Sequence, residues 1–330
     1  ELCRAEGFLD ARYSASRLLI DTVKRTARAV LVLDCGERYT IGSIRFEGST
    51  IDGDLLDRLS PLEVGQVFRR SRVNLLRRNL ENSRYFGLVN VLTLPGDDQL
   101  VAVVVQLTDA ARHDIGLGLG YDTDSGVRAR LRWDLPRLNR HGHTLHNEAT
   151  LSQPIQESAS TNRIPLSDPL DKSLNFTPAW DRREVESTRT TVTRVDSWFL
   201  DEWWDDWIAS WGAGLDQETS REGDEPSVNT SYVLPRLTLN HVVRQLVPDP
   251  VQGHSSWLQT AGSAQALGTD TEFVRIQAGY KRLVHLGGPH LLIGRVELGM
   301  VVTDDIFQVP LSQRFFTGGD QTVRGYELNS

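Results

Sequence analysis

The sequence lacks an excess of basic residues and lacks long apolar runs. Lys and Arg number 36 against 44 Asp and Glu in 330 residues, which gives a formal net charge of −8 at pH 7. Proteins that bind nucleic acid carry a basic stripe that neutralises phosphates, so no nucleic-acid partner is expected. The longest apolar runs, such as 29–33 and 101–105, fall far short of the roughly 20 residues that a membrane-spanning helix needs.

An apolar fraction of 39% nevertheless excludes wholesale disorder. The mean hydropathy of −0.33 is typical of a soluble protein. A transmembrane β-barrel escapes this test, because its strands alternate apolar and polar residues and the average hides the apolar face. Eight Trp, 27 Gly and a single Met are compatible with such a barrel.

Cysteine is almost absent, and no catalytic motif is present. Cys3 and Cys35 are too few for a disulfide framework or a four-ligand zinc site on their own. They end a predicted helix and a predicted strand of one partial domain, so a disulfide between them is conceivable in an oxidising compartment. His141, His143 and His146 have no carboxylate at useful spacing, so no metal is expected. Since a nucleophile elbow, a phosphate loop and an HExxH motif are also missing, we expect neither an enzyme nor a cofactor.

Residues 36–109 mix strand and helix signals. The expected elements, in chain order, are a strand at 37–47, helices at 51–59 and 67–86, and strands at 88–94 and 100–107. Residues 1–35 repeat the second half of this unit, with strands at 10–18 and 27–33. An internal repeat of this kind predicts an array of small domains, entered here partway through one of them.

From Arg112 onward, helical periodicity disappears and alternation of apolar and polar residues takes over. The clearest alternating segments are 113–121, 127–133, 174–180, 207–215, 274–280 and 296–302. Strands of roughly ten residues with one apolar face are typical of an outer-membrane barrel. A soluble β-sandwich alternates in the same way, but Arg128, Arg130 and Arg132 at successive inward positions fit a wet lumen better than a dry core.

About eleven alternating segments precede Val309, whereas bacterial barrels close with an even number of strands. An open sheet edge is costly in lipid, so the last strands are expected to lie outside this chain. The chain also begins at Glu1 without Met or a leader and ends at Ser330 without a natural end, so pieces are expected beyond both ends.

Two groups of motifs resemble known families. The first group, which resembles a POTRA (polypeptide-transport-associated) domain, is Gly36-Glu37-Arg38-Tyr39, Phe46-Glu47-Gly48, Gly65 and Tyr85-Phe86. The second resembles the loop-six signature of the BamA/TamA outer-membrane assembly superfamily; it comprises Arg314, Phe315, Phe316, Gly318, Gly319, Asp320, Val323, Arg324, Gly325 and Tyr326. Within that superfamily, the stretch 120–126 and Gly142-His143 resemble the TamA group most.

The resemblance implies a fold class of α+β POTRA repeats (βααββ) followed by an incomplete antiparallel transmembrane β-barrel, about eleven of about sixteen strands. Residues 1–35 would be the C-terminal part of one POTRA domain and 36–109 a complete one. Residues 110–330 would be the N-terminal part of the barrel, ending in the loop-six motif. The resemblance also implies an outer-membrane location with the POTRA domains in the periplasm.

Arg324 is the loop-six residue with the most specific expected role. The resemblance implies that the loop folds into the lumen, where this guanidinium meets an acidic residue on a strand beyond Ser330. Glycines 318, 319 and 325 permit the tight backbone that such a loop needs. The alternative is an ordinary exposed loop arginine.

The first barrel strand is the second candidate site, with residues Ile115, Gly116, Leu117, Gly118, Leu119 and Gly120. The resemblance implies a lateral gate, where client strands enter the bilayer at the seam beside this strand. Glycine weakens a strand, so pairing with a client by β-augmentation is plausible in physical terms. The alternative, compatible with the first, is that the glycines make lumenal room for loop six.

Two further surfaces are candidates. A POTRA edge strand, at 41–46 or 88–94, would take up an unfolded client in passing; the alternative is a purely structural spacer. Five tryptophans around a predicted periplasmic turn predict a membrane-interface girdle rather than a carbohydrate platform: Trp198, Trp203, Trp204, Trp207 and Trp211.

The favoured function is that of a TamA-like assembly factor that inserts β-barrel clients such as autotransporters. Its implied partners are unfolded outer-membrane protein clients, an inner-membrane-anchored TamB-like protein that spans the periplasm, and outer-membrane lipids. The alternatives are a BamA-like general assembly subunit, a two-partner secretion transporter and, from another class, a passive porin. A porin lacks POTRA repeats and the loop-six motif, which disfavours it.

Overall fold

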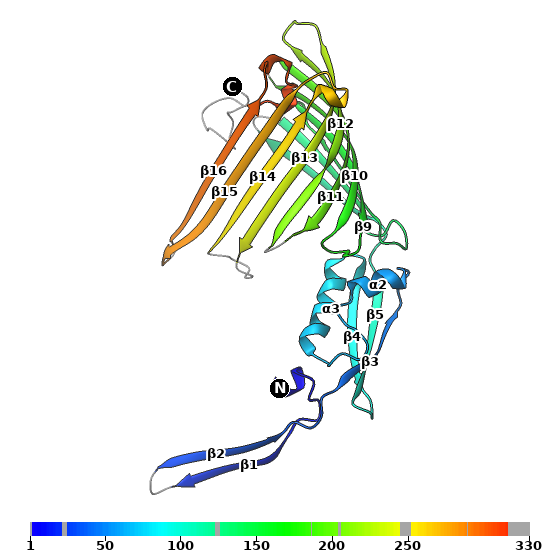
Figure 1. Ribbon diagram of the computed structural model, residues 1–330, viewed down its shortest axis with the longest axis vertical. Helices are drawn as coiled ribbons and strands as arrows, with labels where there is room; N and C mark the ends of the chain where they lie inside the picture. The colour runs from blue at the N-terminus through cyan, green and yellow to red at the C-terminus, as the bar shows by residue number, and fades with distance from the viewer. Residues whose placement is uncertain are drawn as a thin grey trace. The chain divides into compact units, whose positions relative to one another are not determined.

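Figure 1 shows a computed structural model of the chain, which describes residues 2–21, 25–122, 126–185, 187–203, 206–244, 252–288 and 290–315. The chain divides into two units. The first comprises Glu1–Arg112 with Asn139–Gly142, and the second comprises His113–Leu138 with His143–Ser330.

The first unit opens with a short helix and a β-hairpin. Helix α1 (Leu2–Ala5) is followed by β1 (Arg12–Asp21) and β2 (Thr26–Asp34), which pair antiparallel as a separate two-stranded sheet. These strands overlap those predicted from the internal repeat, at 10–18 and 27–33.

The second part of the first unit follows the predicted order of strand, helix, helix, strand and strand. Its elements are β3 (Thr40–Glu47), α2 (Gly53–Leu59), α3 (Arg70–Asn82), β4 (Phe86–Pro95) and β5 (Leu100–Asp109). The sheet order is β3-β5-β4, with β3 parallel and β4 antiparallel to β5. Both strands predicted as possible edges, β3 and β4, are therefore the edges of this sheet.

The core of this domain forms between the helices and one face of the sheet. Every second residue of β5 from Val101 to Leu107 is buried, and α3 buries Val73, Leu76 and Leu80 at helical spacing. Gly48 ends β3 with a φ of +84° and lies so close to the Leu107 carbonyl that a side chain would not fit. Among the described residues, no helix is long and apolar enough to cross a membrane.

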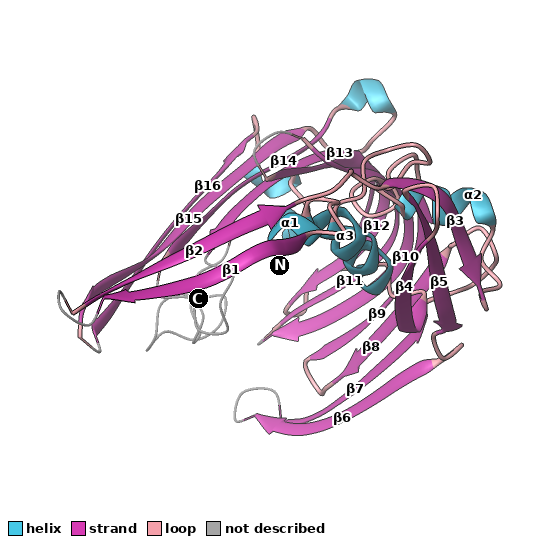
Figure 2. Cartoon of the chain, turned by 90° about the horizontal axis from the view of Figure 1, so that it is seen from below, coloured by secondary structure: helices cyan, strands magenta, loops and turns pink. Residues whose placement is uncertain are grey.

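The second unit is one curved antiparallel sheet of eleven strands in sequential order (Figure 2). Its strands are β6 (Asp114–Asp122), β7 (Gly126–Leu135), β8 (Thr144–Leu151), β9 (Ile155–Pro165), β10 (Ser173–Val185), β11 (Thr188–Glu202), β12 (Trp207–Glu222), β13 (Val228–Arg244), β14 (Gly253–Ser263), β15 (Phe273–Gly287) and β16 (His290–Val302). Three single-turn helices follow β14 or β16: η1 (Gln265–Leu267), η2 (Ile306–Gln308) and η3 (Leu311–Gln313). Within the described residues, β6 and β16 each pair with one neighbour and form the two edges.

The two faces of this sheet differ in polarity. On the convex face, apolar side chains such as Leu117 and Leu119 are 82% and 87% exposed. On the concave face, carboxylates such as Asp216 and Glu218 are buried. Strand residues alternate between faces, so ordinary hydropathy is the average of an apolar outside and a charged inside. The predicted fold class, a POTRA domain followed by a partial antiparallel barrel, is confirmed.

Candidate functional site

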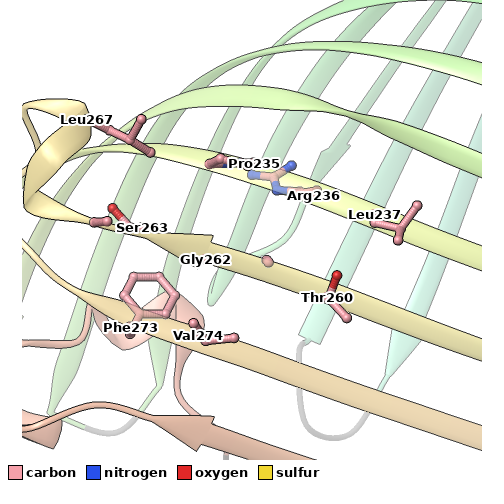
Figure 3. A pocket seen from close by; sticks show the side chains of 11 residues that line it. Pro235, Arg236, Leu237, Thr260, Gly262, Ser263, Leu267, Phe273 and Val274 are labelled. Atoms are coloured by element: carbon pink, nitrogen blue, oxygen red, sulfur yellow. The ribbon is translucent and has the colours of Figure 1, made fainter.

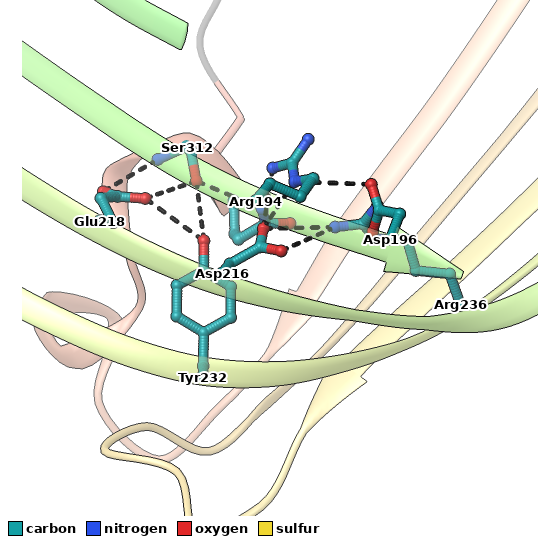
Figure 4. Close-up of polar contacts among 8 residues, drawn as sticks. Arg194, Asp196, Asp216, Glu218, Tyr232, Arg236 and Ser312 are labelled. Carbon is teal, nitrogen blue, oxygen red and sulfur yellow. Dashed lines mark hydrogen bonds and ion pairs between the residues drawn. The ribbon is translucent and has the colours of Figure 1, made fainter. Parts of the chain in front are cut away.

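The concave face of β11, β12 and β13 carries a compact ion-pair network (Figure 4). Arg194 Nη2 lies 2.8 Å from Asp216 Oδ2, and Arg236 Nη2 lies 3.2 Å from the same oxygen. Arg236 Nη1 also lies 2.8 Å from Asp196 Oδ1. Four charges on three neighbouring strands are thus satisfied by one another.

Asp216 is the centre of this network because its side chain is fully buried, at 0% exposure. Burying a lone carboxylate is costly, and two guanidinium partners offset that cost. Removing one member would leave the remaining, partly buried charges with fewer partners of opposite sign. The network therefore fixes β11, β12 and β13 relative to one another on the lumenal side.

Glu218, two residues further along β12, holds a different kind of partner. Its carboxylate is 1% exposed and accepts a hydrogen bond of 2.5 Å from the Ser312 hydroxyl. The Ser312 backbone N–H and the Tyr232 hydroxyl also donate to it, each at 3.4 Å. Within the part of the chain that is described, no cation lies within ion-pair distance of Glu218. This carboxylate therefore binds η3 to the sheet through hydroxyl and amide groups.

The segment Ile306–Phe315, which we call the loop root, contains the first two residues of the predicted loop-six motif, Arg314 and Phe315. Val309 packs into an apolar cluster with Tyr232, Leu234 and Phe273. Arg314 closes the turn on itself, donating from Nε to the Val309 carbonyl and from Nη2 to the Phe307 carbonyl, each at 2.9 Å. The loop root is thus a folded, anchored segment on the concave face.

The contact of Ser312 with Glu218 is the first anchor of the loop root, and Phe315 makes a second one, on β15 and β16. The Arg275 guanidinium lies 4.5 Å from the centroid of the Phe315 ring, a cation–π geometry. On β16, a Cβ placed at Gly299 would lie 2.7 Å from Phe315 Cζ, which is closer than van der Waals contact allows. The missing side chain at position 299 therefore makes room for the ring.

The described residues include only part of the predicted loop-six motif. Arg314 and Phe315 lie on the concave face, as a loop that folds back onto the lumenal wall requires. The other predicted members lie outside the described residues: Phe316, Gly318, Gly319, Asp320, Val323, Arg324, Gly325 and Tyr326. Their roles stay predictions.

The predicted gate strand is β6, an edge of the sheet. Its apolar residues Ile115, Leu117 and Leu119 all point to the convex face and are exposed. Opposite the glycines, β7 presents arginines: Gly116 pairs with Arg132 and Gly118 with Arg130. These arginines are paired in turn, Arg130 with Glu148 and Arg132 with Asp134 at 3.2 Å. The gate function itself stays a prediction.

The aromatic girdle prediction needs one correction. Trp203 and Trp207 lie at the turn that joins β11 to β12, and both Phe199 and Trp203 have ring centroids 6.0 Å from Trp211 on the convex face. Trp198 is the neighbour of Phe199 in β11 and pairs with Gly212. Since successive side chains of a strand alternate between faces, Trp198 lies on the concave face, as Asp196 does. The prediction that it lies at a membrane interface is wrong for this reason. Trp204 lies outside the described residues.

Cys3 and Cys35 are close but not bonded. Their Sγ atoms lie 3.7 Å apart, and both cysteines are free thiols in this structure. Hydrogen bonding to Cys3, followed by partial burial, raises the pKa of the Cys35 thiol. The disulfide stays a prediction. Among the described residues, no group of three or more His, Cys, Asp or Glu is placed to hold a metal ion.

The convex face also carries a shallow groove of about 440 Å³ where the pairing of β13 with β14 ends (Figure 3). Pro235, Leu237, Leu267 and Val274 line it. The pairing ends next to Pro235, which has no N–H to donate. Arg236, Thr260 and Ser263 also line it, but most of its lining is apolar, so it is a poor binding site for a polar ligand.

Sequence reasoning missed the residues that anchor the loop root: Glu218, Tyr232, Arg275, Gly299 and Ser312. Glu218 and Ser312 are 94 positions apart, and no periodicity links them. The one available signal was that Asp216 and Glu218 follow the alternating segment 207–215 directly and continue its polar, inward face. Buried carboxylates at such positions need partners, and this argument alone predicts a packed lumenal site.

Comparisons with known families match most of the chain. Residues 173–330 match the Omp85 superfamily domain. Residues 39–109 match the POTRA family, described as the surface antigen variable number repeat. A curated relative, the outer membrane protein assembly factor BamA of Buchnera aphidicola subsp. Acyrthosiphon pisum, is 28% identical over 130 residues. That alignment covers 38% of this chain and 21% of the relative, so it spans about a fifth of the relative's length.

Solved structures share the fold. BamA from Haemophilus ducreyi lacking POTRA domains 1–3 superposes with a TM-score of 0.84 at 14% identity, over 100% of this chain and 68% of that one. CdiB from Escherichia coli superposes with a TM-score of 0.58 at 13% identity, over 98% of this chain and 63% of that one. The arrangement of a POTRA domain before an antiparallel barrel sheet is common to them.

Proposed function

The chain is a member of the BamA/TamA outer-membrane assembly superfamily, and from that premise we propose that it helps to fold and insert β-barrel clients such as autotransporters. It is an outer-membrane protein whose POTRA domain is periplasmic. The observation that carries the proposal is the composition of β6, the first strand of the sheet, which has an exposed apolar face and glycine at positions 116, 118 and 120.

The physical case rests on the cost of an open strand in lipid. Each unpaired backbone group there costs several kcal/mol, so the edge of β6 is a strong template for another strand whenever the seam beside it opens. A client strand that pairs with β6 satisfies these groups and turns its own apolar side chains to the lipid. Gly116, Gly118 and Gly120 weaken β6, which favours exchange of its partner. Folding of the client then supplies the driving force, without a nucleotide or a catalytic step.

The loop root has a supporting role in this proposal. Its two anchors, Ser312 on Glu218 and Phe315 between Arg275 and Gly299, fix the point from which loop six continues. The proposed partners are unfolded outer-membrane protein clients, outer-membrane lipids and a TamB-like protein anchored in the inner membrane.

The similarity to CdiB favours a second candidate, export of a polypeptide as in two-partner secretion. The two candidate functions differ in the final location of the client polypeptide. An assembly factor releases its client sideways into the bilayer as a folded barrel, whereas a secretion transporter passes it through the lumen in an unfolded state. The BamA-like alternative, a general barrel-assembly subunit, would act on a wider range of β-barrel clients.

The test uses full-length protein in liposomes, a urea-denatured autotransporter β-domain and a photocrosslinking residue at position 117 or 215. Leu117 and Leu215 both point outward and are exposed, but Leu215 lies in β12, at the centre of the sheet. We expect client crosslinks at 117 and not at 215, together with a heat-modifiable folded client. Equal crosslinking at both positions would contradict the β6 proposal. A passenger protected inside the vesicles without a folded client would favour secretion, and ion flux alone would favour a porin.

A further inference from the structure

The rim of the sheet where β13 ends and β14 begins carries a notch of about 400 Å³ on the convex face. It is lined by Gly253 and by the side chains of Val243, Gln252, His254, Arg282, Leu283 and Val284. His254 and Arg282 are direct cross-strand partners on β14 and β15. The notch therefore combines one guanidinium, one imidazole and one amide with three apolar side chains.

The strand order identifies this rim as the periplasmic one. β6 follows the periplasmic POTRA domain directly, so it begins at the periplasmic rim. Strands of the sheet run alternately up and down, so β12 and β14 begin at the same rim as β6. His254, at the start of β14, lies at this rim, and so does its partner Arg282.

A row of aromatic and imidazole rings marks the level of the membrane interface beside the notch. Trp207 stacks on His241 with ring centroids 4.9 Å apart, and His241 lies 5.4 Å from His254. His254 in turn lies 6.1 Å from Tyr280. Tryptophan and tyrosine concentrate where lipid headgroups meet the apolar core, so the row places the notch at headgroup depth.

The charge of Arg282 has no counterion among the described residues. Its one described polar contact is a weak hydrogen bond of 3.4 Å to the Tyr280 hydroxyl. On the concave face, by contrast, Arg194 and Arg236 are each bound to aspartate. A guanidinium at the boundary of a bilayer is stabilised by an anion, and it binds phosphate oxygens in bidentate geometry.

We propose that this notch binds the phosphate of an anionic phospholipid from the periplasmic leaflet. Arg282 binds two phosphate oxygens, His254 and Gln252 donate further hydrogen bonds, and the first acyl carbons lie against Val243 and Val284. The inference rests on the outer-membrane location and not on client insertion, so the two can fail separately.

The test measures lipid retention by the full-length protein in native mass spectrometry, from detergent micelles doped with equal phosphatidylglycerol and phosphatidylcholine. Arg282→Gln is compared with Lys281→Gln, which removes the same charge one residue away on the concave face. We expect Arg282→Gln to lower the preference for phosphatidylglycerol about fivefold, the size of one basic residue at an anionic surface. Lys281→Gln should leave it unchanged, and Arg282→Lys should fall between the two. Heat-modifiable mobility confirms that each variant is folded.

Three results would overturn the proposal. Equal losses in Arg282→Gln and Lys281→Gln would indicate attraction by net charge, without a site. No loss in Arg282→Gln would show that the notch holds no phosphate. Displacement of the retained lipid by millimolar inorganic phosphate would identify the ligand as free phosphate. If Arg282→Gln fails to fold, His254→Gln replaces it, with the same expected loss and the same control.

Discussion

The centre and the edge of the eleven-stranded sheet are built in opposite ways. At the centre, β12 has 16 residues, pairs on both sides and carries the buried Asp216 and Glu218. At the edge, β6 has nine residues, one described neighbour and glycine at three concave positions. The buried polar contacts are gathered where the loop root docks, whereas the ion pair between β6 and β7, Arg132 with Asp114 at 3.6 Å, is more than half exposed. A strong centre allows a weak edge to exchange partners without loss of the fold.

The largest expected effect comes from breaking the centre. Asp216→Ala removes the shared partner of Arg194 and Arg236 and leaves both guanidiniums partly buried without it. Loss of one member of a buried ion pair costs about 3–5 kcal/mol. Urea unfolding of the full-length protein in lipid vesicles should show a loss of this size. The control is Glu184→Ala, which breaks an exposed pair with Arg189 and should cost less than about 1 kcal/mol.

The anchor of the loop root is the next contrast. Ser312→Ala removes the hydroxyl that donates to Glu218 at 2.5 Å and also contacts Tyr232. A hydrogen bond to a charged group contributes about 1.5–3 kcal/mol, and the loss should appear as faster proteolysis of loop six as well as lower stability. Glu218→Gln in the Ser312→Ala background should add little. Fully additive losses would show that the two side chains act independently, against the anchor.

Much of this contrast could be predicted from the sequence. Alternation in 113–121 and 127–133 correctly predicted the apolar face of β6 and the inward arginines of β7, because side chains of a strand alternate strictly between faces. The same rule failed at Trp198, where Trp198 and Phe199 are both aromatic and either parity suits the pattern. Only the pairing of Phe199 with Trp211 decides which of them points outward.

The loop root could not be predicted in this way. The contacts of Ser312 with Glu218 and of Phe315 with Gly299 depend on where the loop root packs on the concave face of the sheet. No local periodicity encodes that position. Nothing in the sequence around Gly299 distinguishes it from other glycines. Its role becomes visible only when the ring of Phe315 is seen to lie against it.

Filling the space at Gly299 tests the second anchor. Gly299→Ala puts a methyl group about where the Phe315 ring lies, so the ring must move away from Arg275. Since Phe315 is partly exposed and can shift, we expect the low end of an overpacking cost, about 1 kcal/mol. Gly294→Ala on the same strand is the control, because a Cβ there meets no atom within 4 Å. Restored stability in a Gly299→Ala, Phe315→Ala double variant would locate the strain at this contact.

Strengthening the edge should have a smaller effect on stability but a specific one on function. Gly118→Val introduces a good strand former on β6, and its Cβ would meet Arg130 Cβ at an ordinary 3.7 Å. We expect a gain of about 0.5–1 kcal/mol together with slower client insertion in liposomes. Gly294→Val on β16, the other edge, should not slow insertion. Unchanged insertion by Gly118→Val would argue against partner exchange at β6.

The smallest expected effect concerns the turn 166–172 between β9 and β10, which lies outside the strands and between the edge and the centre. Partial burial, followed by repulsion from Asp168 and Glu202, raises the pKa of Asp171 from 3.8 to about 6. Between about pH 4 and 6 the folded protein therefore holds a proton that the unfolded chain has lost, so stability falls as the pH rises through this window. Asp171→Asn should flatten that slope in unfolding midpoints measured from pH 4 to 7. Asp224→Asn, in an exposed turn between β12 and β13, is the control that removes one carboxylate elsewhere on the chain. If the slope of stability against pH is unchanged in Asp171→Asn, the carboxyl of Asp171 is open to water. The turn would then lack the burial of acidic side chains that distinguishes the concave face of β12.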